Sequence, residues 1–68
     1  MIQINYDGLW KILIDHNMKK KDLHNELNIG TGTIAKMSKG EPVSMEVLAK
    51  ICYAFKCNIE DIVRFVYE

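Results

Sequence analysis

The stretch that decides the fold is KKDLHNELNIGTGTIAKMS, residues 20–38. Leu23 and Leu27 are four residues apart, and Ile34 and Met37 are three apart. Both are spacings that place apolar side chains on one face of a helix. The stretch therefore predicts two short amphipathic helices joined by a tight turn.

The two helices are expected at residues 20–27 and 31–38. Asn28 tolerates a left-handed backbone better than most residues, so it suits the end of the first helix. Gly30 is a permissible cap for the second. This spacing is that of a helix-turn-helix, in which Leu23, Ile29 and Ile34 should meet at one point. Such a contact holds the second helix at the surface, where it can enter a DNA groove about 12 Å wide.

Three more helices are expected around this motif. The first begins at Asp7 as its cap and runs to about His16. A fourth, capped by Ser44, runs to about Phe55. A fifth begins at Asn58, where Asp61 three residues later completes a capping box. Ile59 and Ile62 are expected to face inward from this last helix.

Apart from Met1 and Val66, the two ends of the sequence alternate apolar and polar residues, over residues 1–5 and 63–68. Alternation of this kind predicts short strands, which pair either within the chain or between chains. The predicted fold class is all-α: five helices in a single domain, residues 1–68, with two short terminal strands.

The charge of the 68-residue chain is zero overall but unevenly distributed. Residues 18–40 carry five lysines against two carboxylates, a net charge of +3. Residues 1–17 carry a net charge of −1, and residues 41–68 a net charge of −2. The helix-turn-helix is thus a positive patch on a neutral protein, as a contact with phosphates requires.

Several other classes of function find no support in the sequence. Cys52 and Cys57 lack the spacing and the partners of a zinc site, so buried reduced thiols are favoured over a metal or a disulfide. His16 and His24 lack metal-spaced partners and are expected to be structural or exposed. No nucleophile–base pair or phosphate-binding glycine loop is present, so neither catalysis, a cofactor nor a small-molecule substrate is expected.

The sequence also lacks an apolar run of about 20 residues and a secretory signal, so no membrane contact and a cytoplasmic location are expected. The aromatic residues lie at helical spacing. Trp10, Tyr53 and Phe55 are therefore expected to serve the core or an interface instead of stacking on bases.

These features together resemble the Cro and phage-repressor type of helix-turn-helix, also called the XRE family, from about Leu9 to Ile62. The resemblance implies a five-helix phage-repressor-like domain. It also implies a transcriptional regulator, for which we expect a repressor that binds operator DNA as a homodimer. The matching positions are Met18, Leu23, Leu27, Ile29, Thr33, Ile34, Lys39, Gly40, Ser44, Leu48, Ile51, Phe55 and Ile62.

The resemblance also implies a set of DNA contacts. Lys20 and Lys39 match phosphate-contacting positions, and Thr31 and Gly32 match positions that meet base edges. Thr33 matches a small hydroxyl position near a base or phosphate. Lys36 lies on the same side of the second helix, and Lys19 belongs to the lysine run that begins the first. The expected set is Lys19, Lys20, Thr31, Gly32, Thr33, Lys36 and Lys39.

Two residues depart from the family pattern. His24 stands where Ala is usual, so it must tilt outward or widen the crossing of the two helices. Gly32 has no side chain to read a base and costs about 1 kcal/mol in a helix relative to Ala. Specificity is therefore expected to depend on Lys36, on threonine methyl groups and on DNA shape.

One alternative stays open from the sequence. The domain could be a protein-interaction module of helix-turn-helix shape, such as an antitoxin, an anti-repressor or an adaptor, without strong DNA binding. The zero net charge, Gly32 and the acidic residues 41–68 favour it.

Overall fold

The computed structural model describes residues 2–67; the ends of the two predicted strands, Met1 and Glu68, lie outside the described residues. Five helices and two strands occur within this range, which confirms the predicted fold class. In chain order they are β1 (Ile2–Asn5), α1 (Asp7–Asp15), α2 (Lys20–Leu27), α3 (Thr31–Ser38), α4 (Met45–Phe55), α5 (Ile59–Ile62) and β2 (Arg64–Tyr67).

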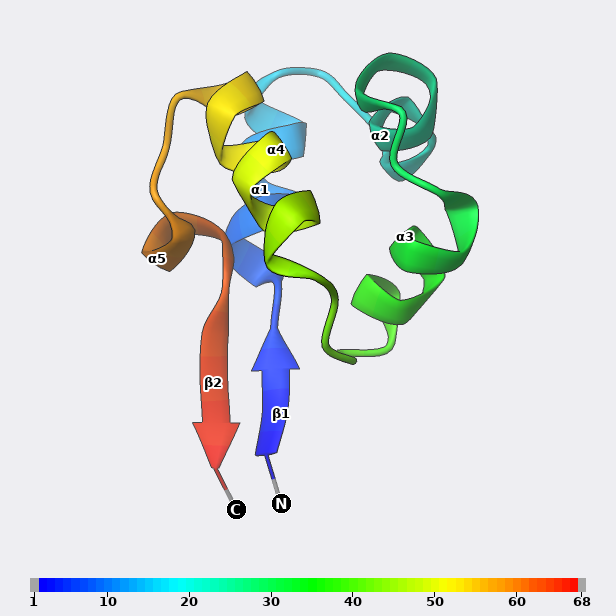
Figure 1. Ribbon diagram of the computed structural model, residues 1–68. Helices are drawn as coiled ribbons and strands as arrows, with labels where there is room; N and C mark the ends of the chain where they lie inside the picture. Colours follow the sequence, from blue (N-terminus) through cyan, green and yellow to red (C-terminus); the bar gives the residue numbers. More distant parts are fainter. Residues whose placement is uncertain (1, 68) are drawn as a thin grey trace.

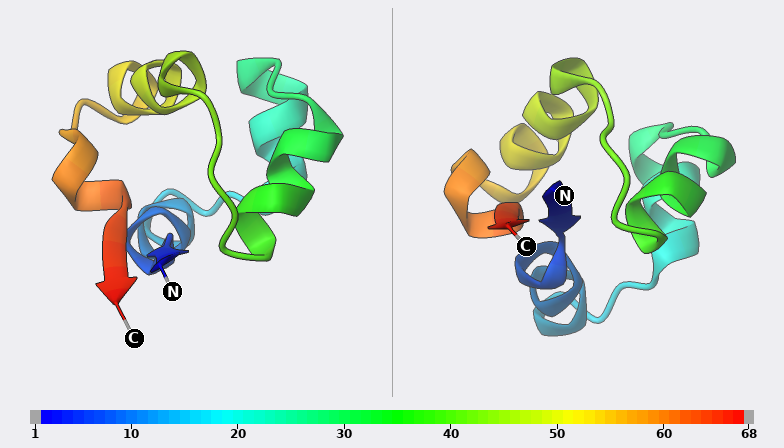
Figure 2. Two further views of the ribbon diagram at one scale, coloured as in Figure 1. Left: turned by 60° about the horizontal axis from the view of Figure 1, so that its bottom comes forward. Right: turned by 90° about the horizontal axis from the view of Figure 1, so that it is seen from below.

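The helices form two neighbouring groups above the strand pair (Figure 1). On one side α1 packs against α5, and α5 packs against α4. On the other side α2 packs against α3, and contacts between α2 and α4 join the two groups. Two further views show α2 and α3 together at one side of the molecule, away from β2 (Figure 2).

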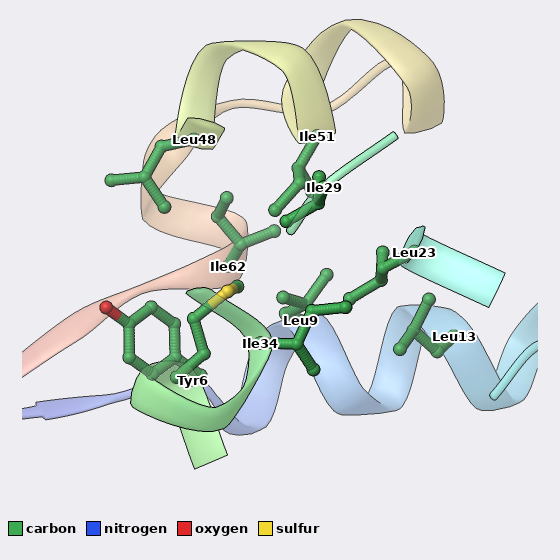
Figure 3. Packing of buried hydrophobic residues seen from close by; sticks show 10 residues of the cluster. Tyr6, Leu9, Leu13, Leu23, Ile29, Ile34, Leu48, Ile51 and Ile62 are labelled. Carbon is green, nitrogen blue, oxygen red and sulfur yellow. The ribbon is translucent and has the colours of Figure 1, made fainter. Parts of the chain in front are cut away.

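One buried cluster joins all five helices, and the residues that lock the helix-turn-helix belong to it. Leu23 is fully buried, Ile29 is 2% exposed and Ile34 is 9% exposed, so the three residues that were expected to meet all lie in this shared core. The labelled side chains converge from α1, α2, α3, α4, α5 and the α2–α3 turn (Figure 3). The buried residues are Tyr6, Leu9, Leu13, Leu23, Ile29, Ile34, Met37, Leu48, Ile51 and Ile62.

The start of α1 differs from the expectation. Tyr6, not Asp7, is the cap residue, and Asp7 is the first residue of the helix. The Asp7 N–H donates to Asn5 Oδ1 at 2.7 Å, so the side chain that satisfies this end comes from two residues earlier. Tyr6 is free to enter the core, where it is 3% exposed.

The caps of α4 and α5 are as predicted. The N–H of Val47 donates to Ser44 Oγ at 3.3 Å, and the N–H of Asn58 donates to Asp61 Oδ2 at 2.9 Å. The inward direction expected for Ile62 is confirmed, because it is fully buried. The inward direction expected for Ile59 is wrong, because its side chain is 39% exposed. The helix α5 has a single turn, so only part of its surface faces the core.

The two strands pair within the chain, in antiparallel register, with Ile4 opposite Phe65 and Gln3 opposite Val66. The outer edge of β1 meets the loop after α3. There the Ile4 N–H donates to the Gly40 carbonyl at 3.2 Å. Gly40 has a φ of +75°, and a Cβ at this position would lie 3.1 Å from the Ile4 carbonyl oxygen. Glycine is therefore required where α3 connects to the strand pair.

Candidate nucleic-acid interface

The turn between α2 and α3 has the backbone that the sequence predicts. Asn28 adopts the left-handed conformation, with a φ of +60°, and Gly30 is the extended cap residue of α3. His24 tilts outward, is exposed and places Nδ1 3.0 Å from the Ile29 carbonyl oxygen. The His24 ring therefore binds the turn and does not separate α2 from α3. The side chain is larger than the Ala that the family usually has at this position, but it finds space outside the crossing of the two helices.

The helix α3 divides into a buried and an exposed face. Ile34 and Met37 enter the core, whereas Thr31, Gly32 and Lys36 are exposed. Lys36 comes four residues after Gly32, so these two positions lie on the same side of the helix. One face of α3 is thus packed in the core, and the opposite face is exposed, so this helix can lie against the surface of another molecule.

Ala35 also belongs to this exposed face, although it is not among the DNA contacts expected from the sequence. It follows Gly32 by three residues and Thr31 by four, which is the signal that would have identified it. Its methyl group can contact a thymine methyl group in the major groove. With Gly32 it forms a flat strip beside Lys36, where another surface can approach the helix closely.

Thr33 differs from the other predicted residues on α3, because it is half-buried. A Cβ built on Gly30 would lie 4.0 Å from Thr33 Oγ1, so the hydroxyl is turned toward the α2–α3 turn. The structure therefore places Thr33 at the edge of the exposed face and not at its centre.

The lysines predicted at the start of α2, Lys19 and Lys20, lie near the C-terminal end of α3, which is the end opposite the α2–α3 turn. Lys20 Nζ donates to Ser38 Oγ at 3.1 Å, which brings the first residue of α2 to the last residue of α3. Lys39 follows directly and is exposed, as is Lys19, the cap residue of α2. The structure thus brings the start of α2 and the end of α3 together, and positive charge gathers there.

The loop that follows α3 is tied to the core. The Tyr6 hydroxyl donates to the Glu41 carbonyl at 2.7 Å, and burial raises the pKa of this phenol. The Glu41 N–H donates to the Lys36 carbonyl at 2.9 Å. These bonds fix the end of the helix that carries the exposed face.

Other kinds of site find little material among residues 2–67. The two thiols, Cys52 and Cys57, are half-buried and not fully buried as expected, and burial and the nearby Cys52 raise the pKa of Cys57. No group of three or more His, Cys, Asp or Glu residues is placed to hold a metal ion in this range. No helix of the same range is long and apolar enough to cross a membrane.

Comparisons with known proteins agree with this geometry. Residues 8–68 match the family model described as the Cro/C1-type HTH DNA-binding domain. The chain is also similar to the crystal structure of the transcriptional regulator VanUg, form II, with a TM-score of 0.91 and 39% identity over 98% of this chain and 89% of that one. No curated protein matches the chain. The chain therefore belongs to the Cro/C1-type helix-turn-helix DNA-binding domains, a family of DNA-binding transcriptional regulators.

Proposed function

We propose that the chain is a sequence-specific regulator that binds operator DNA as a homodimer, with α3 in the major groove. The observation that carries the proposal is the exposed face of α3, which is bordered by lysines while its other face is locked in the core. The flat strip at Gly32 and Ala35 supports a close approach to base edges. Lys36 supports contact with a guanine edge or a phosphate.

The lysines at the far end of α3 support a second role, in fixing the helix on the DNA backbone. Lys19, Lys20 and Lys39 lie where the start of α2 meets the end of α3. Phosphate contacts position a protein on the duplex, whereas base contacts specify the site. We propose repression as the outcome, because a domain bound over a promoter blocks other proteins by occupancy alone.

The experiment that tests this is selection of bound sites from a random pool of double-stranded DNA. We expect enrichment of a palindrome whose half-sites are about one helical turn apart. A reporter gene with that palindrome across its promoter should then be less active when the protein is present. Recovery of no enriched sequence, together with no salt-sensitive DNA binding, would overturn the proposal.

A protein-interaction module without strong DNA binding is the second candidate. One observation favours it: the Lys20 ammonium is already engaged by Ser38 and by the Trp10 ring. Pull-down from the native host discriminates between the two. A stoichiometric protein partner, with no DNA enriched in the selection, supports this candidate.

A further inference from the structure

Two cysteines meet at the C-terminal end of α4. Cys52 lies in the last turn of the helix, and Cys57 is the second residue after it, beyond Lys56, whose backbone is left-handed with a φ of +56°. The Cys57 N–H donates to the Cys52 carbonyl at 3.1 Å. This bond is typical of a Schellman helix end, in which the side chains of the two bonded residues commonly contact one another. The end of α4 therefore places two sulfur atoms side by side.

The two thiol groups are in contact, and solvent still reaches them. Both are reduced and half-buried, and both pack against the core cluster. Burial raises the pKa of Cys57, and so does the Cys52 thiol, with which it forms a hydrogen bond. A thiol with a raised pKa forms little thiolate, so it is slow to enter a disulfide. The pair therefore persists as two adjacent thiols that a sulfur-binding ion can reach.

The number of donors decides which ion fits this pair. Within residues 2–67, no third His, Cys, Asp or Glu side chain joins the two thiols in a group that could hold a metal ion. Among the metals that thiolates select, structural zinc is almost always four-coordinate, and iron–sulfur clusters need four protein ligands. Cu(I) has a filled d shell and accepts two thiolates in a linear arrangement. Two sulfur donors without a third therefore select Cu(I).

We propose that Cys52 and Cys57 bind one Cu(I) ion between their Sγ atoms. In this step two S–H bonds break and two Cu–S bonds form. The two protons go to the solvent, and no electron is transferred, so the ion enters and leaves as Cu(I). The site goes beyond DNA binding and does not rest on it.

The charges at this end of α4 suit a bound cation. The C-terminal end of a helix carries a partial negative charge, which attracts a positive ion. Once two thiolates have bound Cu(I), the complex has a net charge of −1, and the carboxylate of Asp61 lies near Cys57. Lys56, between the two cysteines, offsets this negative charge. Its ammonium group stays at the helix end, 5.0 Å from the centre of the Tyr53 ring.

The ion would join two elements of the fold. Cys57 directly precedes Asn58, the cap residue of α5, so the two Cu–S bonds connect the last turn of α4 to the start of α5. The helix α5 in turn packs against α1. An ion that binds the folded chain stabilises it by mass action. At a free ion concentration of 100 Kd, the midpoint of thermal unfolding should rise by on the order of 10 °C.

Titration with Ag(I) tests the stoichiometry. Ag(I) is a soft ion that also takes two thiolates, and it stays in one oxidation state during the experiment. The probe is added to the reduced, full-length chain without oxygen, and native mass spectrometry follows the products. We expect one ion per chain, with a mass increase of one silver less two protons. Two ions per chain, or one ion that holds two chains together, overturns the proposal.

Serine variants test whether both thiols are needed. Cys52→Ser and Cys57→Ser should each weaken Ag(I) binding by about 10²–10⁴-fold, because the second ligand is no longer held beside the first. The matched control is Cys52→Ser with Lys50→Cys, which keeps two thiols in the chain. Position 50 is exposed and lies on another side of α4, so this variant should bind as weakly as Cys52→Ser alone. Native affinity in the control, or in either single variant, contradicts the site.

X-ray absorption of the native chain loaded with Cu(I) tests the coordination without any substitution. We expect two sulfur neighbours around the copper and no nitrogen. A third sulfur or a nitrogen neighbour means that the ion is bound elsewhere or between chains, and overturns the proposal.

Discussion

The ammonium group of Lys20 lies 4.4 Å from the centre of the Trp10 ring. The same group donates to Ser38 Oγ at 3.1 Å. One side chain at the start of α2 thus touches α1 and the end of α3, and it helps to hold the helix-turn-helix on the rest of the domain. A phosphate at this end of α3 would have to share the ammonium with both partners or replace them.

Lys20 and Trp10 should be energetically coupled. Lys20→Met and Trp10→Leu each remove one member of the pair, and the double variant removes both. An exposed cation–π contact predicts a coupling free energy of about 0.5–1 kcal/mol in a double-mutant cycle. Urea denaturation of the four proteins measures it, and strictly additive losses would contradict the contact.

Lys36 and Lys39 should each contribute a phosphate contact to DNA binding. Lys36→Ala and Lys39→Ala are expected to weaken binding and to reduce the slope of log affinity against log salt by about 0.9 per contact. Fluorescence anisotropy with a labelled operator measures both quantities. Lys50→Ala is the control, because Lys50 is an exposed lysine on α4. If all three variants keep the native slope, the predicted contacts are wrong.

Tyr6 should make the protein less stable at alkaline pH. Burial raises the pKa of Tyr6 in the folded state, so its contribution is complete below the unfolded pKa of about 10. It is lost as the pH rises through the folded pKa, since the unfolded chain gives up the proton first.

Urea denaturation over this pH range tests the prediction for Tyr6. Tyr6→Phe should cost about 1 kcal/mol at neutral pH, since the hydroxyl no longer donates to the Glu41 carbonyl. The variant should also decline less steeply at alkaline pH. An alkaline decline as steep as that of the native protein would assign the effect to other groups.

Gly8 and Gly32 should respond in opposite ways to alanine. A Cβ at Gly8 would overlap the Asp61 backbone carbonyl, where α1 meets α5, so Gly8→Ala should destabilise the fold by about 1–3 kcal/mol. A Cβ at Gly32 meets nothing within 4 Å, so Gly32→Ala should stabilise the fold by about 1 kcal/mol. Thermal denaturation compares the two, and a loss of stability in Gly32→Ala would contradict the open space there.

Local signals predicted most of the secondary structure. The bounds of α2 and α3 were predicted from the spacing of apolar residues and from Asn28. The left-handed backbone of Asn28 ends α2 locally and does not depend on distant parts of the chain. Ser44 and Asn58 likewise act within a few residues of themselves. The prediction of Asp7 as the cap of α1 was wrong, because two nearby polar residues, Asn5 and Asp7, could both supply a side-chain acceptor. In the structure Asn5 supplies it, and the N–H of Asp7 is the donor.

The candidate site was predicted less completely, because exposure on α3 depends on what the rest of the fold covers. Thr33 is half-buried beside the turn, whereas Ala35 is exposed. Ala35 has no polar group, so its residue type does not indicate a DNA contact. The bond between Lys20 and Ser38 joins residues 18 positions apart. Apolar periodicity gives each helix an inner face but does not say which neighbour that face meets.

By itself, then, the sequence determined the five helices, the turn between α2 and α3 and the concentration of positive charge around them. Each of these depends on residues within a few positions of one another. The tertiary structure alone decided that the Tyr6 hydroxyl binds the loop after α3, that Gly40 binds the outer edge of β1 and that β2 pairs with β1 within the chain. These contacts join residues 35 or more positions apart, and the packing of the shared core brings them together.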